Sequence, residues 1–158
     1  MRERPALTLA VKEREKLRKI LDLSDRLGEL RLRVREDGTS IPTTDLGEEV
    51  RSIAGSVVTI GLPGALGALA GEHRFAPQET LILLLLLNRR IEAGESTLTG
   101  RELLSTLFPS SYGILSGAAL LRPESALRTS GAIVICPAGA SDLLEASFAV
   151  SDERPSGA

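Results

Sequence analysis

Hydrophobic positions in the first part of the chain change their spacing at Gly28. Between residues 9 and 27, apolar side chains recur every three or four positions with charges between them, as in an amphipathic helix. Gly28 then stands where a glycine commonly ends a helix. In residues 30–35 apolar and basic residues alternate, which predicts a half-buried strand before a turn at Asp37-Gly38. A continuous coiled coil through residue 35 is the competing interpretation.

Residues 39–75 carry weaker patterns. We expect a short helix that begins at Thr44 or Asp45 and closes near Gly55, then a short strand at 57–60 and a short helix at 62–70. Five glycines between residues 55 and 71 weaken every assignment here. Each glycine costs a helix up to about 1 kcal/mol relative to alanine.

The strongest pattern begins at Pro77, a residue well suited to a first helical turn. Residues 81–87 are consecutive apolar positions, followed directly by Asn88, Arg89 and Arg90. A helix that crosses a bilayer needs about 20 mostly apolar residues. We therefore predict no membrane span, but a helix from Pro77 to Gly94 that is buried on most of its circumference.

Downstream, Thr99 and Glu102 have the spacing of a capping box, which predicts a helix that ends at Phe108-Pro109. A third helix is expected at 110–121, because the residue before Pro123 disfavours helical geometry. One or two helical turns follow before two short strands, at 132–136 and 143–151.

Three helices followed by a hairpin are the order of a winged helix. The predicted fold class is therefore mainly α with a small β-hairpin. We expect a winged-helix-like domain at 62–151, preceded by a charged helical extension with a strand (1–38) and a connecting segment (39–61). Residues 152–158 are predicted to form a disordered tail.

Composition and charge narrow the classes of function. The 158 residues carry a net charge of −2 and a pI near 5.5, which argue against general attraction to nucleic acid or anionic membranes. Residues 1–37 nevertheless hold 11 Lys/Arg against 8 Asp/Glu. A single cysteine excludes an intramolecular disulfide and suits a reducing cytoplasm, and "MRERPALTLA" has no long apolar run typical of a secretory signal.

The familiar catalytic motifs do not occur in the sequence. There is no Gly-Lys-Ser/Thr for a nucleotide-binding loop, no Gly-x-Ser-x-Gly, and only His73 and Cys136 to serve as soft metal ligands. We interpret His73 as a solvated loop residue, Cys136 as a small core residue and Glu48-Glu49 as a solvated helix face. We expect neither an enzyme nor a bound cofactor.

The predicted third helix also bears on nucleic-acid binding. Helices that read a DNA groove carry Arg, Lys, Asn or Gln toward base edges and phosphates. Residues 110–121 contain none of these, and their composition is almost wholly Ser, Gly, Ala and Leu. A face of small residues suits close packing against protein, so nucleic acid is not the expected partner.

The second half of the chain resembles a known type of domain. The sequences "LLLLNRRIEAGESTLTGRELLSTLFP", "ALLRPESALRTSGAI" and "FAVSDE" are similar to the winged-helix segment that precedes the ATPase module in certain bacterial AAA-type ATPases, including those encoded with contractile injection systems. The resemblance covers roughly residues 62–153 and implies an accessory or docking domain. In that family the ATPase module follows, whereas this chain ends at Ala158, so we expect either a stand-alone relative or a fragment.

The predicted function is protein–protein interaction, as an adaptor or regulatory domain of an AAA-type ATPase or of a large assembly such as a contractile injection system. We also expect self-association through the N-terminal segment, because a lone helix of this length needs a partner for its apolar stripe. The candidate interface residues are Leu17, Ile20, Leu21, Leu27, Leu30, Leu32, Val34, Tyr112, Leu115 and Arg122. The alternative is a small DNA-binding transcriptional regulator that contacts phosphates through Lys12, Arg14, Lys16, Arg18 and Lys19.

Overall fold

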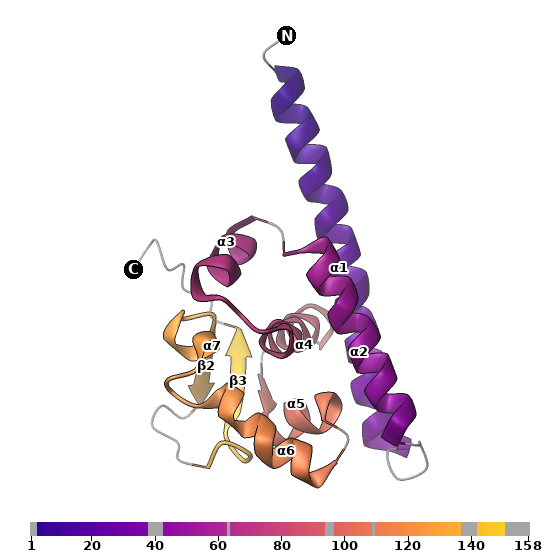
Figure 1. The fold of residues 1–158 in the computed structure, drawn as a ribbon, viewed down its shortest axis with the longest axis vertical. Coiled ribbons are helices and arrows are strands. Elements are labelled where there is room, and N and C mark those ends of the chain that lie inside the picture. Colours follow the sequence, from indigo (N-terminus) through magenta and orange to yellow (C-terminus); the bar gives the residue numbers. More distant parts are fainter. Residues whose placement is uncertain are drawn as a thin grey trace.

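The computed structural model describes residues 3–37, 43–62, 64–93, 97–108, 110–136 and 142–150. This part of the chain is mostly helical and includes a small three-stranded antiparallel sheet (Figure 1). The helices are α1 (Glu3–Asp37), α2 (Thr43–Ile60), α3 (Gly64–His73), α4 (Pro77–Ala93), α5 (Gly100–Leu107), α6 (Ser111–Gly117), the 3₁₀ turn η1 (Ala118–Leu121) and α7 (Ala126–Thr129). The strands are β1 (Thr97–Thr99), β2 (Ile133–Cys136) and β3 (Ser147–Val150).

Helix α1 runs without a break through Gly28, so the predicted helix end and the strand at 30–35 are wrong. The glycine serves a tertiary contact instead. A Cβ built at Gly28 would lie 2.1 Å from Oδ1 of Asn88, and glycine therefore lets α1 approach α4 closely. Leu30 and Leu32, which would share one face of a strand, lie on different sides of the helix: Leu30 is buried and Leu32 is exposed. Helical spacing was thus the correct interpretation of the segment.

Helix α2 also passes through a glycine that was expected to end it. Gly55 faces open space, and the helix continues to Ile60, so the predicted strand at 57–60 is wrong. Apolar residues at intervals of three and four form the buried stripe of α2, namely Leu46, Val50, Ile53 and Val57. The helix stops at Gly61, whose φ of +78° glycine adopts without strain. Helix α3 follows close to its predicted range.

Helix α4 is the centre of the structure, as its leucine run predicted. Side chains 81–86 are each at most 1% exposed. Figure 1 shows α4 almost end-on while α1 and α2 run lengthwise beside it, so α4 crosses both at a steep angle. On its other sides α4 contacts α5 and the sheet. Its first turn is closed by Glu79, whose Oε1 accepts from the backbone N–H of Ala76 at 2.9 Å.

Within the described residues, no single helix is both long and apolar enough to cross a membrane. One pair of helical segments, Gly100–Leu107 and Tyr112–Thr129, is together long and apolar enough for a membrane span, but the two segments are bent by 120° relative to each other. Four leucines of this pair are core residues, fully buried within the chain: Leu103, Leu104, Leu121 and Leu127.

The sheet has the order β1-β3-β2, with both neighbouring pairs antiparallel. The predicted hairpin is present as β2 and β3, whereas β1 was not predicted because three residues are too few for a periodic pattern. Leu98 pairs with Phe148 across β1 and β3, and both side chains are buried against the helices. Thr97, Thr99 and Ser147 lie on the opposite face, since side chains alternate along a strand.

The predicted capping box is confirmed. Thr99 Oγ1 accepts from the backbone N–H of Glu102 at 3.1 Å, and the Glu102 carboxylate accepts from the backbone N–H of Thr99 at 3.3 Å. The third predicted helix is also present, as α6 and η1, and it ends before Arg122 as expected. Its small residues have a use within the chain, because Gly113 and Gly117 lie directly against the Phe108 ring and backbone.

One hydrophobic core joins these elements. Ile20, Leu23, Leu27 and Leu30 of α1 belong to the same buried cluster as the leucines of α4. Residues 1–38 and 39–61, predicted as an extension and a connecting segment before the winged-helix-like domain, therefore contribute side chains to the same core as that domain. The fold class is confirmed in its coarse form, mostly helical with a small sheet. The predicted tail at 152–158 and the Gly38 turn lie outside the described residues.

Candidate interaction surfaces

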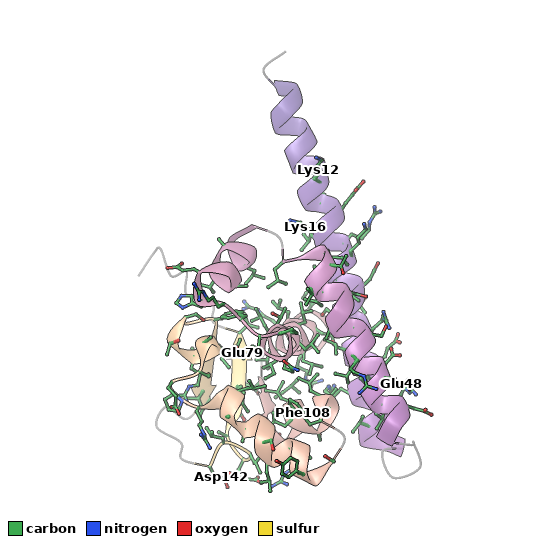
Figure 2. All side chains as sticks on the ribbon, viewed as in Figure 1. Lys12, Lys16, Glu48, Glu79, Phe108 and Asp142 are labelled. Atoms are coloured by element: carbon green, nitrogen blue, oxygen red, sulfur yellow. The ribbon has the colours of Figure 1, made fainter. Side chains whose placement is uncertain are left out.

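The first candidate surface lies on α6 and η1. Ser110 caps α6, its Oγ accepting from the backbone N–H of Gly113 at 3.0 Å. Because the glycine side of the helix packs on Phe108, the opposite side faces outward (Figure 2 labels Phe108 where α5 and α6 meet). Tyr112 is 82% exposed and Leu115 is 68% exposed. We call this surface the α6 face; it consists of Tyr112, Leu115, Ser116 and Ala119.

The four residues of the α6 face stand at positions i, i+3, i+4 and i+7, so helical geometry places them on one side of the helix. It has no charged residue, and Arg122 lies exposed just beyond its end. Tyr112 and Leu115 therefore form the apolar part of a small surface that carries no charge.

The candidate interface residues on α1 divide into two groups. Ile20, Leu27 and Leu30 are 2%, 0% and 1% exposed, so they are core residues and offer no surface to a partner. Leu17, Leu21 and Leu32 are exposed, and Val34 is half-buried. With 3.6 residues per turn, the three exposed leucines fall within an arc of roughly 60°. We call Leu17, Leu21 and Leu32 the leucine face of α1.

The N-terminal half of α1 extends beyond the rest of the structure (Figure 1). Lys12 lies on this projecting part, as Figure 2 shows. Lys12, Arg14, Arg18 and Lys19 are exposed, whereas Lys16 is half-buried beside the end of α2. Helical geometry places Arg14 and Arg18 on one side of α1, and Lys12 and Lys19 roughly 100° or more away. The five cations therefore do not form one continuous row.

A cleft that the sequence did not predict lies between α1, α4, α5, α6 and the outer face of the sheet. Its volume is about 690 Å³. We call it the arginine cleft and define it by Arg31, Arg89, Arg101, Thr97, Thr99, Ser147, Val34 and Ile114. These residues are separated in sequence by up to 116 positions, from Arg31 to Ser147, so no local motif marks the cleft.

Ion pairs connect the cleft to its surroundings. Nη1 of Arg31 lies 3.5 Å from Oε2 of Glu102, the same carboxylate that closes the capping box. Arg101, at the rim, donates to Glu145, and this hydrogen bond together with the negative charge raises the pKa of the Arg101 guanidinium. Both pairs link α5 to another element, α1 in one case and the loop before β3 in the other.

The remaining residues that the sequence singled out do not form a site. His73 is the last residue of α3 and half-buried, so its placement in a loop was wrong. Cys136 is exposed at the end of β2, which corrects its interpretation as a core residue. Glu48 is exposed, while Glu49 pairs with Arg26 at 3.0 Å. Among the described residues, no three metal-binding side chains come together.

Comparisons with models of protein families, with curated proteins and with solved structures find no match to this chain.

Proposed function

We propose that this chain is a non-catalytic protein–protein interaction domain, an adaptor or regulatory unit of an AAA-type ATPase or of a large assembly such as a contractile injection system. The observation that carries the proposal is the α6 face. It exposes Tyr112 and Leu115 on a helix whose sequence contains no cation. The resemblance of residues 62–153 to accessory domains of such ATPases supplies the class of partner.

The element order supports a winged-helix interpretation of residues 62–151. Helix α4, strand β1, helices α5 and α6, and strands β2 and β3 follow in that order, with β3 in the middle of the sheet. In DNA-binding proteins of this helix-turn-helix type, the second helix of the pair enters the major groove. Here that position belongs to α6, which offers an aromatic and an aliphatic side chain. Such a surface is suited to a protein groove or helix.

The leucine face of α1 supports self-association as part of the same function. Helix α1 exposes Leu17, Leu21 and Leu32 on one side, and a second copy that covers them would remove apolar surface from water and support the projecting half of the helix. Residues 1–18 hold six Lys/Arg against three Asp/Glu, whereas residues 19–37 hold five of each. An antiparallel pair of α1 helices would therefore keep the two positive halves apart.

The basic residues of α1 favour one other candidate, binding to duplex DNA. A row of phosphate contacts would give an affinity that falls steeply with salt, with a slope set by the number of neutralised phosphates. Because Lys12, Lys16 and Lys19 share one side of α1 and Arg14 and Arg18 another, at most about three of the five cations can face one DNA strand at a time. We therefore expect a shallow salt slope and weak binding in fluorescence anisotropy with a duplex of mixed sequence. A steep slope that the charge-reversed variant Arg14→Glu/Arg18→Glu abolishes would favour DNA.

Affinity purification from the native cell tests the proposal. Wild-type protein is compared with Tyr112→Ser/Leu115→Ser, and the control is Val58→Ser/Ile91→Ser, which removes exposed apolar groups from α2 and α4. We expect an AAA-type ATPase or an assembly component among the proteins recovered with the wild type and the control, and its loss from the α6 variant. Equal recovery with all three proteins would contradict a role for the α6 face.

A further inference from the structure

A second cavity lies between α3 and the adjoining parts of α1, α2 and α4. Its volume is about 560 Å³, within the range of about 300–1,000 Å³ that is common for small-molecule sites. We call it the α3 pocket and define it by Lys16, Val57, Leu62, Gly67, Gly71 and Phe75. Its described lining residues include none of the α6 face.

One side of α3 consists of small residues and lines this pocket. They stand at positions i, i+3, i+4 and i+7, namely Gly64, Gly67, Ala68 and Gly71. Gly67 is required by packing, because a Cβ there would lie 2.2 Å from the carbonyl oxygen of Leu62. A Cβ at Gly71, in contrast, would meet nothing within 4 Å in the described structure. Since glycine weakens a helix relative to alanine, packing does not account for Gly71, whose effect is to keep the pocket open.

The walls of the α3 pocket are apolar and carry one charge. Val57 and Leu62 are buried and Phe75 is half-buried. Lys16 lines the pocket from α1 (Figure 2), is half-buried, and is the one charged group among the described lining residues. Within the described part of the chain, Lys16 has no hydrogen-bond or ion-pair partner. A partly buried ammonium of this kind attracts a carboxylate more strongly than one at an open surface.

We propose that the α3 pocket binds a carboxylate at the end of a flexible apolar chain, as in a medium-chain fatty acid. The carboxylate pairs with the Lys16 ammonium, and the apolar chain lies along the small-residue side of α3 against Val57 and Phe75. The charge of the ligand follows from the lining, which offers a cation and, among its described residues, no carboxylate to repel it. This proposal goes beyond the proposed function and does not depend on the α6 face binding a protein.

Heteronuclear NMR titrations of the full chain with octanoate, octan-1-ol and octylamine test the role of the charge. The three compounds share one chain and carry a negative, a neutral and a positive end at pH 7. Ionic strength is held constant, and each compound stays below the concentration at which it aggregates. We expect saturable shifts at the amides of Gly67, Gly71 and Phe75, with octanoate binding about fivefold or more tightly than octan-1-ol, because its hydrogen bond to Lys16 is charge-assisted. Octylamine should bind most weakly.

Hexanoate tests the role of the chain. Each fully buried methylene is worth about 0.8 kcal/mol, or about fourfold in affinity. Because the pocket is partly open, we expect hexanoate, with two fewer methylenes, to bind about fivefold more weakly than octanoate. Equal affinities for all four compounds, or shifts that rise linearly with each of them, would overturn the proposal.

Filling the pocket tests where the chain binds. Gly71→Leu places a side chain in open space and raises helix propensity, so it should abolish octanoate binding while the melting temperature stays the same or rises. Gly55→Leu on α2 is the matched control, since it also faces open space but does not line the pocket, and it should keep the affinity. If Gly71→Leu does not fold, Ala68→Leu at an exposed lining position provides the same test.

Removing the charge tests the role of Lys16. Lys16→Met keeps an apolar stem and should reduce the affinity for octanoate to that for octan-1-ol or below. Arg18→Met removes an exposed cation roughly 200° around α1 and should leave the preference for octanoate unchanged. Wild-type affinity for octanoate in the pocket-filling variant or in Lys16→Met would contradict the proposal, whatever the outcome for the α6 face.

Discussion

Replacing Gly28 by alanine tests how α1 is held against α4. In an open helical position the change would stabilise the protein by up to about 1 kcal/mol, because alanine has the higher helix propensity. At Gly28, however, the new Cβ would lie 2.1 Å from Oδ1 and 2.8 Å from Cγ of Asn88. Asn88 must then move, although it is 9% exposed and its Nδ2 donates to Oδ1 of Asp25 at 3.1 Å.

The change in the free energy of unfolding is the difference between the cost of moving Asn88 and the gain in helix propensity. Displacing Asn88 loses a hydrogen bond to a carboxylate, worth about 1.5–3 kcal/mol, and crowds a closely packed contact. Subtracting the propensity gain, we expect Gly28→Ala to destabilise the chain by about 1–2 kcal/mol, a fall in the melting temperature of roughly 2–8 °C for a chain of this size. The matched control is Gly55→Ala in α2, where nothing lies within 4 Å and stabilisation is expected.

Urea unfolding followed by far-UV circular dichroism measures both changes, and a double-mutant cycle with Asn88→Ala identifies the cause. In the Asn88→Ala background the obstacle is absent, so Gly28→Ala should become stabilising by about 1 kcal/mol. If Gly28→Ala is equally costly in both backgrounds, the glycine is required by the backbone. The helix would then end at Gly28, and the continuous α1 would be refuted.

Further substitutions at three places probe the core, the helix cap and the leucine face. Leu84→Asp should cost several kcal/mol by burying an unpaired charge in α4, and a cooperatively melting variant of near-native stability would contradict that placement. Thr99→Ala should destabilise by about 1 kcal/mol and Thr99→Gly by less, and an unchanged melting midpoint would mean that the cap does not stabilise α5. Leu17→Glu/Leu21→Glu should convert an oligomer to a monomer in light scattering, whereas a monomeric wild type would dismiss the leucine face as a contact between copies.

The sequence was sufficient where the signal was local. The leucine run predicted the buried α4, and the spacing of Thr99 and Glu102 predicted the start of α5, because both depend on residues within one helix. The end of the third helix before Arg122-Pro123 was predicted for the same reason, since proline restricts only its immediate neighbour.

Predictions failed where a distant contact decides the outcome. Gly28 resembled a helix end, but its partner is Asn88, 60 residues further along the chain. The alternation of residues 30–35 is compatible with a strand or with a helix in which Arg31 reaches Glu102 and Arg33 reaches solvent. Packing of α1 against α2 and α4 selects the helix. The arginine cleft could not be predicted because six elements contribute to it, namely α1, α4, β1, α5, α6 and β3.

Composition predicted the exposure of some candidate interface residues and not of others. Tyr112 and Leu115 were selected as apolar residues of a helix without cations, and the structure places both on the outside. Ile20, Leu27 and Leu30 were selected by the same apolar criterion, yet they are buried. Hydrophobicity alone does not distinguish a residue that packs within the chain from one that is available to a partner.

Photo-crosslinking from position 112 tests the central claim most directly, namely that the α6 face contacts a protein. Benzoylphenylalanine replaces Tyr112 in the full chain, where the 82% exposure of the tyrosine leaves room for the added benzoyl group. Glu48, exposed on α2 (Figure 2), is the control position. After irradiation in the native cell, we expect position 112 to crosslink to an AAA-type ATPase or to a component of a large assembly, and position 48 to give no such product. Crosslinking of position 112 to DNA, or the same products from positions 112 and 48, would contradict the claim.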